Sequence, residues 1–133
     1  MFRLDGKNAL ITGASGGIGG EIAKALHASG ACVALSGTRV EPLQALADEL
    51  GSRAYVLPCN LSDAEAVTAL PKQAADVMGS VDILVNNAGV TRDNLFMRMS
   101  DEEWTSVLDI NLTSTMRLCK GVMRGMMKAR WGR

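Results

Sequence analysis

Five glycines lie between residues 13 and 20, directly after a short apolar run and directly before helix-forming residues. Glycine loses more conformational entropy on folding than any other residue, so such a cluster inside an ordered domain needs a physical reason. A backbone without β-carbons can approach a ligand closely, and a helix that begins there adds free N–H groups and a partial positive charge. Together these features favour a phosphate group. A tight strand-to-helix turn without a ligand is the alternative interpretation.

Residues 36–39 follow the second apolar run and contain no carboxylate. In dinucleotide-binding sheets, an acidic residue at this position holds the ribose 2′-OH of NAD and repels a phosphate. Thr38 and Arg39 lie here instead, and a guanidinium group suits bidentate contact with a phosphate. The segment therefore predicts NADP(H) rather than NAD as the cofactor, with a solvated loop charge at Arg39 as the alternative.

Short apolar runs alternate with segments of helical spacing along the chain. We expect strands at residues 8–13, 32–37, 54–58 and 81–86, and helices at about 17–29, 42–50, 62–79 and 100–129. This alternation predicts an α/β fold, a Rossmann-type doubly wound parallel sheet with strand order 3-2-1-4 and helices on both faces. Ligands of such sheets bind at the carboxyl ends of the strands where the order reverses, and the glycine cluster follows strand 1 at that point.

Local signals set the expected helix ends. Ser62 and Ser100 each begin a capping box with the glutamate three residues later. Pro71 should kink or break the third helix. The last helical region should bend near residues 111–115, because these residues are polar or β-branched and favour helices weakly.

The composition fits one domain spanning residues 1–133. Net charge is zero, from 14 basic and 14 acidic residues, so neither nucleic acid nor an anionic membrane is an expected partner. No apolar run approaches the roughly 18 residues of a membrane span, and the first residues lack the apolar core of a signal peptide. The three cysteines lie far apart without metal-ligand spacing. We therefore expect free thiols, no metal site and a cytoplasmic location.

Three motifs, in this order along the chain, resemble those of the classical short-chain dehydrogenase/reductases. They are T-G-x-x-x-G-x-G at residues 12–19, N-N-A-G at 86–89 and the asparagine of D-I-N-L-T-S, Asn111. The stretches GVTRDNLFMRMSDEEW and VMRGMMKARWGR are most similar to the 3-oxoacyl-[acyl-carrier-protein] reductases within that family. The resemblance extends from Asp5 to Arg133 and implies a dinucleotide-binding domain, the amino-terminal part of such a reductase.

The resemblance also implies which residues bind NADP(H). These are Thr12, Gly13, Ala14, Ser15, Gly16, Gly17, Ile18, Gly19, Thr38, Arg39, Asn60, Leu61, Asn87, Ala88 and Gly89. Asn60 would contact the adenine edge, where relatives commonly carry aspartate, or would only shape the following turn. Gly16 stands where many relatives carry arginine, which removes one cation near the 2′-phosphate. The asparagine pair at 86–87 is also an ordinary turn signal.

By the same resemblance, Asn111 is catalytic: it would bend its helix and hold a water molecule in a proton relay. A solvent-facing side chain is the alternative. The implied reaction is NADPH-dependent reduction of 3-oxoacyl-[acyl-carrier-protein] to the 3-hydroxyacyl form in fatty-acid biosynthesis. Acyl carrier proteins are acidic, so Arg130 would contact them, although cations there also complement a helix C-terminus. A homotetramer is implied, and the methionines between residues 116 and 127 fit either a core or a subunit interface.

The family's catalytic Ser, Tyr and Lys have no counterpart in this chain. Its only tyrosine is Tyr55, inside an expected strand and without a lysine four residues later. Reduction of a ketone needs a proton donor near the carbonyl oxygen, so we expect the 133-residue chain alone to be inactive. It would supply the cofactor half of a reductase, incomplete at its C-terminal end, with strand 4 as a bare edge that favours association. The alternatives are an inactive dinucleotide-binding fragment and a reductase of another small ketone such as acetoacetyl-CoA.

Overall fold

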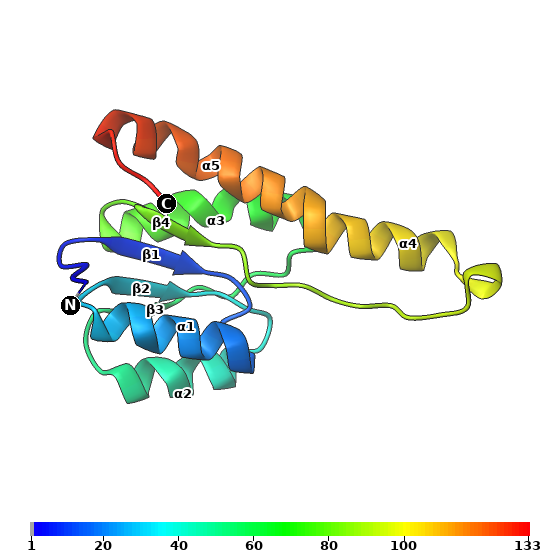
Figure 1. Ribbon diagram of the computed structural model, residues 1–133, viewed down its shortest axis with the longest axis horizontal. Helices are drawn as coiled ribbons and strands as arrows, with labels where there is room; N and C mark the ends of the chain where they lie inside the picture. Colours follow the sequence, from blue (N-terminus) through cyan, green and yellow to red (C-terminus); the bar gives the residue numbers. More distant parts are fainter. Residues whose placement is uncertain (1) are drawn as a thin grey trace.

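Four short parallel strands form the centre of the molecule (Figure 1). The computed structural model describes residues 2–133 and places the strands at β1 (Asn8–Ile11), β2 (Cys32–Leu35), β3 (Ala54–Val56) and β4 (Ile83–Val85). Their order is β3-β2-β1-β4, which confirms the expected topology. Ile11 pairs with Leu35 on one side and with Val85 on the other. The carboxyl ends of β1, β2 and β4 therefore lie level with one another.

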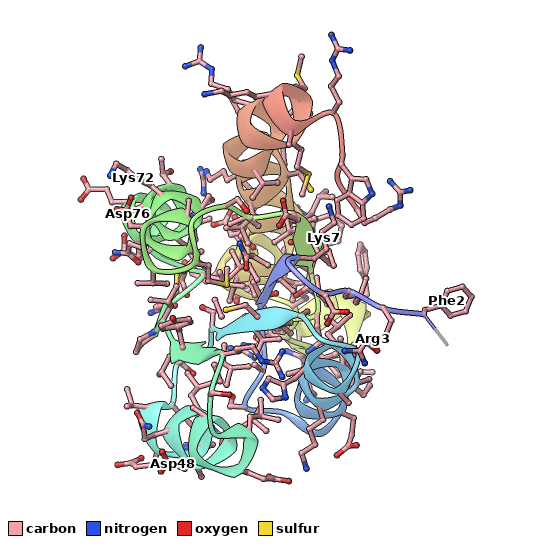
Figure 2. The ribbon with its side chains drawn as sticks, turned by 90° about the vertical axis from the view of Figure 1, so that its left-hand side faces the viewer. Phe2, Arg3, Lys7, Asp48, Lys72 and Asp76 are labelled. Carbon is pink, nitrogen blue, oxygen red and sulfur yellow. The ribbon has the colours of Figure 1, made fainter. Side chains whose placement is uncertain are left out.

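Helices cover both faces of the sheet, as expected (Figure 1). On one face lie α1 (Gly17–Ala28) and α2 (Val40–Leu50), and on the other lie α3 (Ala64–Met78) and α5 (Ser114–Ala129). Seen along the strands, Asp48 on α2 and the ion pair of Lys72 with Asp76 on α3 point into solvent from different sides of the molecule (Figure 2).

β1, β2 and β4 each contribute to two cores, because successive side chains point to opposite faces of a sheet. Ala9 and Ile11 pack beneath α1 and α2, whereas Leu10 packs beneath α3 and α5. All three are fully buried. This explains why the strands are continuous apolar runs rather than alternating ones.

Asp63 begins α3, and the predicted cap at Ser62 is therefore wrong. The Asp63 carboxylate accepts from the N–H groups of Glu65 at 3.1 Å and Ala66 at 3.2 Å. The Ser62 hydroxyl donates to Asn60 instead, at 2.8 Å, so it is not available to cap the helix.

Pro71 does not break α3, which continues to Met78, so of the predicted kink or break the break is wrong and the kink stays a prediction. Pro71 is buried and packs against Gly121 of α5. A β-carbon added at Gly121 would lie 2.6 Å from the ring of Pro71. The predicted cap at Ser100 is present, since its hydroxyl accepts from the N–H of Glu103 at 3.1 Å, whereas the Glu103 carboxylate accepts from Asn94 and does not complete the capping box.

The last helical region forms a long rod that extends beyond the sheet (Figure 1). It consists of α4 (Asp101–Leu108), a π-helical turn η2 (Asp109–Thr113) and α5, and we call residues 101–129 the rod. Where we predicted a bend near residues 111–115, the structure has this π-helical turn over Asp109–Thr113. An extended segment, residues 86–100, runs from β4 alongside the rod to its start and includes the short helix η1 (Phe96–Arg98).

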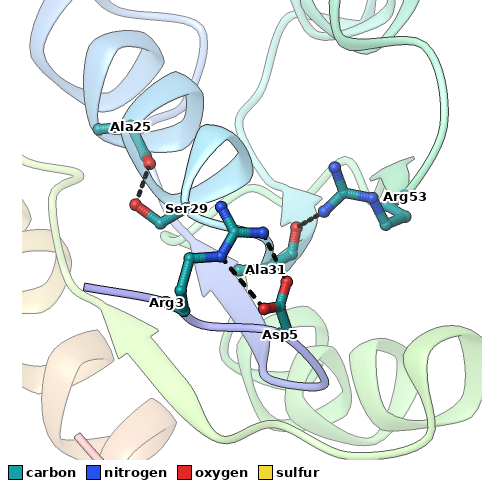
Figure 3. A network of polar contacts seen from close by, with 6 residues as sticks. All are labelled: Arg3, Asp5, Ala25, Ser29, Ala31 and Arg53. Carbon is teal, nitrogen blue, oxygen red and sulfur yellow. Dashed lines mark hydrogen bonds and ion pairs between the residues drawn. The ribbon is translucent and has the colours of Figure 1, made fainter. Parts of the chain in front are cut away.

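Polar contacts lie near Arg3 and near the start of β2 (Figure 3). Arg3 and Asp5 form an ion pair at 2.8 Å, and the hydrogen bond from Arg3 lowers the pKa of the Asp5 carboxyl. Arg53 donates to the carbonyl of Ala31 at 2.7 Å, across the start of β2. These contacts lie at the edge of the sheet opposite the glycine cluster.

The last residues partly cover β4, which we expected to be a bare edge. The N–H of Arg133 donates to Asp82 at 3.0 Å, and its carbonyl accepts from Leu84 at 2.9 Å. This pattern is that of a residue in a parallel neighbouring strand. Trp131 lies next to it, with the Lys7 ammonium 4.1 Å from its ring centre.

Candidate functional site

A cavity of about 430 Å³ lies at the carboxyl edge of the sheet, between the ends of the four strands. All the predicted cofactor residues except Ala14 line it. Ala14 is buried beneath the cavity, and its N–H donates to Ser36 at 2.9 Å. The sequence analysis missed several lining residues, namely Ser36, Gly37, Cys59, Val90 and Ile110. Most of these directly neighbour predicted residues, which was the available signal for them.

The start of α1 presents unpaired hydrogen-bond donors to this cavity. Gly16 is the N-cap and makes no side-chain capping bond. The N–H groups of residues 17–19 have no hydrogen-bond partner within the described part of the chain, residues 2–133. Since these donors sit at the positive end of a helix dipole, this wall of the cavity suits an anion.

Two of the glycines are required by packing alone. Gly13 has φ +63°, and a β-carbon there would lie 2.9 Å from the Cα of Ala88. At Gly19, a β-carbon would overlap the carbonyl oxygen of Gly13 and lie 2.6 Å from the amide nitrogen of Asn87. The tight-turn interpretation therefore accounts for these two positions.

Gly17 is different, because a β-carbon there would meet nothing within 4 Å. It is exposed, lines the cavity and has an ordinary helical backbone. Nothing within the described residues requires glycine here, whereas close approach of a ligand would. This position separates the ligand-binding interpretation from the tight-turn interpretation.

Thr12 holds two strand ends together. Thr12 is buried, with 2% of its surface exposed. Its hydroxyl accepts from the N–H groups of Asn87 and Ala88, each at 3.1 Å. Its own N–H and hydroxyl point to the carbonyl of Val85, at 3.0 and 3.3 Å. Both donors of Thr12 are therefore used within the protein, and neither is free to donate to a phosphate. Ser15 retains that capacity, because its hydroxyl has no partner within residues 2–133.

Asn60 shapes the turn after β3, as its alternative interpretation proposed. Its side-chain oxygen accepts from the N–H of Ser62 at 3.0 Å and from the Ser62 hydroxyl at 2.8 Å. The residue also lines the cavity. Next to it, burial raises the pKa of the Cys59 thiol, and the Asp63 carboxylate raises it further.

Arg39 is the one charged side chain among the described residues that line the cavity. It lies with Thr38 at the end of β2, and both are exposed. Because no carboxylate lines this end, nothing among the lining residues would repel a ribose phosphate.

Asn111 lies behind the cavity rather than in its lining. Its amide oxygen accepts from the N–H of Val90, and its amide nitrogen donates to the carbonyl of Val90, both at 2.8 Å. The π-helical turn is thus joined to the segment that follows β4. The residue is exposed, and its amide is also hydrogen-bonded, so the solvent-facing alternative stays open and the proton-relay role stays a prediction.

Arg130 lies at a second, more apolar cavity of about 530 Å³. It ends α5 with φ +55° and is exposed beside Met127 and Trp131. Elsewhere, the ring nitrogen of His27 lies 2.7 Å from the carbonyl of Ser52. Residues 2–133 contain no group of three or more His, Cys, Asp or Glu side chains placed to hold a metal ion. None of the described helices is long and apolar enough to cross a bilayer.

Comparisons with known proteins agree with this geometry. The family model described as short chain dehydrogenase matches residues 7–133. The chain is 55% identical over its whole length to nodulation protein G of Rhizobium sp. (strain N33) and covers 54% of that protein. Over 132 residues it is 51% identical to the 3-oxoacyl-[acyl-carrier-protein] reductase of Vibrio cholerae, again covering 54% of that protein. The chain thus spans about half the length of the curated relatives it matches.

A solved structure leads to the same family. The crystal structure of a candidate short-chain alcohol dehydrogenase from Sinorhizobium meliloti 1021 matches 96% of this chain and 52% of that protein, with a TM-score of 0.89 and 37% identity. The sheet order, the cavity at its reversal point and the match over residues 7–133 together show that the chain belongs to the short-chain dehydrogenase family, and membership implies a nicotinamide dinucleotide cofactor.

Proposed function

We propose that this chain supplies the NADP(H)-binding half of a reductase that converts 3-oxoacyl-[acyl-carrier-protein] to the 3-hydroxyacyl form in fatty-acid biosynthesis, in the cytoplasm. The observation that carries the cofactor assignment is the start of α1, with its unpaired N–H groups and open space at Gly17. Similarity to the 3-oxoacyl-[acyl-carrier-protein] reductase of Vibrio cholerae supports the substrate assignment. When bound, the cofactor supplies a hydride, and the residues of this chain position it.

The cavity supports a division of roles along its walls. The donors of residues 15–19 would hold the pyrophosphate, and Thr38 with Arg39 would hold the 2′-phosphate. Thr12 positions residues 87–89 through its buried hydroxyl, and Asn111 positions Val90. Asn111 remains our candidate for the proton relay.

Substitution of Gly17 tests the cofactor assignment. Gly17→Ala places a methyl group in the open space beside the free N–H groups, so it should lower NADPH affinity at least about tenfold, a loss of about 1.4 kcal/mol. Gly20→Ala is the matched control, because a β-carbon at Gly20 makes only ordinary contacts and Gly20 does not line the cavity. Titration of nicotinamide fluorescence measures both. If the parent and Gly17→Ala bind NADPH with equal affinity, the cofactor assignment at the start of α1 is wrong.

We also propose that the rod binds a second copy of this chain, antiparallel. Its apolar side is exposed at positions four residues apart, namely Trp104, Leu108, Leu112 and Met116, and all of these except Leu108 are more than half exposed. Residues 101–113 carry four acidic and no basic side chains, whereas residues 114–129 carry four basic and no acidic ones. Antiparallel pairing would place the acidic half of one rod against the basic half of the other. Arg117→Glu should then weaken association in sedimentation, and so should high salt.

Arg130 is the proposed contact for the acidic carrier protein. Arg130→Glu should weaken binding of acetoacetyl-[acyl-carrier-protein] to this chain, and the loss should shrink at high salt because exposed charges act mainly on encounter. Arg98→Glu is the control, since it makes the same charge reversal in the distant helix η1. Equal losses for both variants would remove Arg130 from the contact.

A dinucleotide-binding module without reductase activity is the second candidate. It is favoured by Tyr55, the only tyrosine, which lies in β3 and does not line the cavity. The intact mass of the protein in its own cells distinguishes the two candidates, since a mass well above 14.1 kDa allows for catalytic residues outside this sequence. Turnover of acetoacetyl-CoA but not of carrier-protein substrate would favour a reductase of another small ketone.

A further inference from the structure

The amide of Asn60 has a fixed orientation. A backbone N–H can only donate, so the side-chain atom that faces the N–H of Ser62 at 3.0 Å must be the oxygen. The Ser62 hydroxyl uses the same oxygen at 2.8 Å. An amide oxygen has two lone pairs, and both are therefore occupied. What Asn60 can still offer is its NH₂ group, for which no acceptor lies within hydrogen-bond distance among residues 2–133.

The position of Asn60 in the cavity indicates which part of a bound dinucleotide this NH₂ group would contact. The start of α1 follows β1 and suits the phosphates, and residues 38–39 follow β2 and suit the ribose. β3 is the next strand beyond β2 in the sheet, and Asn60 and Leu61 follow it. The base of a bound dinucleotide therefore reaches residues 60–61. This step rests on the proposed function.

Adenine presents a donor, its 6-amino group, next to an acceptor, N1. A 6-oxo base reverses both, with an acceptor at O6 and a donor at N1. A side chain that only donates finds one acceptor on either base. An aspartate at the same position would behave differently, because it could keep one oxygen in the turn and offer the other to the 6-amino group.

We propose that Asn60 recognises the base of the dinucleotide as a donor only, so that the site binds a cofactor with a 6-oxo base about as tightly as one with adenine. The turn at Ser62 sets this specificity, because the side-chain oxygen of Asn60, its one side-chain acceptor, is already hydrogen-bonded to Ser62. Asn60 is thus a residue that determines tolerance at the 6-position of the base.

The test is a comparison of NADPH with its hypoxanthine analogue, measured by calorimetric titration of the full 133-residue chain. The parent should bind the two within about threefold. Asn60→Asp preserves the turn and restores an acceptor, so it should prefer NADPH by at least about tenfold, the value of one hydrogen bond to a charged group. Gln73→Glu is the control: it makes the same change of amide to carboxylate on the exposed side of α3, outside the cavity, and should keep the parent ratio.

Each outcome decides the question. A parent preference of more than about threefold for NADPH overturns the inference and leaves the proposed function intact. An unchanged ratio in Asn60→Asp, or a Gln73→Glu ratio that shifts as much as that of Asn60→Asp, also overturns it. If the folded parent binds neither cofactor, the proposed function fails, and the inference fails with it.

Discussion

The β1–α1 turn and the rod differ in how far the chain itself explains them. At the turn, Gly13 and Gly19 are required by neighbouring backbone, and the Thr12 hydroxyl is buried with its partners. Along the rod, Leu112 is 64% exposed and Met127 71%, so most of the surface of these apolar side chains faces solvent. The turn is therefore preorganised before any ligand binds, whereas the rod carries an apolar surface that requires a partner to be buried. Substitutions in the two regions should have different effects.

The largest effect should come from the turn. Gly19→Ala forces a β-carbon into the Gly13 carbonyl, and we expect a loss of about 3 kcal/mol in the free energy of unfolding. Gly17→Ala, two residues earlier, should leave stability unchanged or raise it by up to about 1 kcal/mol, because alanine favours the helix. Urea unfolding of both variants measures the difference. Similar losses for both would show that the open space at Gly17 is not real.

Opposite sides of α5 offer a second contrast. Leu118 is 1% exposed, so Leu118→Ala should cost about 3 kcal/mol. Met116 is 54% exposed, and Met116→Ala should cost less than about 0.5 kcal/mol at concentrations where the chain is monomeric. The same variant should weaken association at higher concentration. If Met116→Ala destabilises the dilute chain as much as Leu118→Ala, the rod is not an open surface.

Removing the hydroxyl of Thr12 should lower the free energy of unfolding by a smaller amount. Thr12→Val leaves the N–H groups of Asn87 and Ala88 without their acceptor, at a cost of about 2 kcal/mol. Thr12→Ser keeps the hydroxyl and should cost less. Chemical denaturation compares the two, and a valine variant as stable as the serine variant would contradict the account of the turn.

The smallest effect is a pH dependence at Cys59. Burial raises the pKa of its thiol in the folded state, above the roughly 8.5 of an unfolded cysteine. At lower pH both states are protonated, so the thiol adds no pH dependence. As pH rises past the unfolded value, the unfolded chain loses the proton first, and the folded state loses stability.

Cys59→Ala should therefore flatten the fall of stability between about pH 8 and 10. Cys32, whose pKa burial also raises, is present in both proteins and cancels from the comparison. Urea midpoints measured across this range provide the test. A parent and variant with parallel pH profiles would show that Cys59 ionises as freely in the folded chain as in the unfolded one.

The sequence predicted the elements whose causes are local. The glycine turn and the cap at Ser100 follow from patterns within a few residues, strand order follows from the alternation of strands and helices with right-handed crossovers, and the structure agrees with them. The failures depend on distant or competing contacts. Pro71 stays within a continuous helix that packs on Gly121, fifty residues later, and the cap moved to Asp63 because Asn60 takes the Ser62 hydroxyl.

The candidate site shows the same limit. Its glycines and polar strand ends were found from sequence, but the use of each donor was not. Thr12 is hydrogen-bonded to residues 87–88, up to 76 positions away, and Asn111 is hydrogen-bonded to Val90, 21 positions away. Such pairings depend on how the strands align, which periodicity alone does not specify.

The central claim is that the cavity at the end of β1 holds NADP(H), with Arg39 at the 2′-phosphate. Titrating the chain with NADPH and NADH tests it most directly. The account predicts tighter binding of NADPH, by at least about tenfold for a phosphate bonded to a guanidinium. Arg39→Gln should abolish that preference without weakening NADH. Tighter binding of NADH by the parent, or an Arg39→Gln variant that keeps the full preference, would contradict the account.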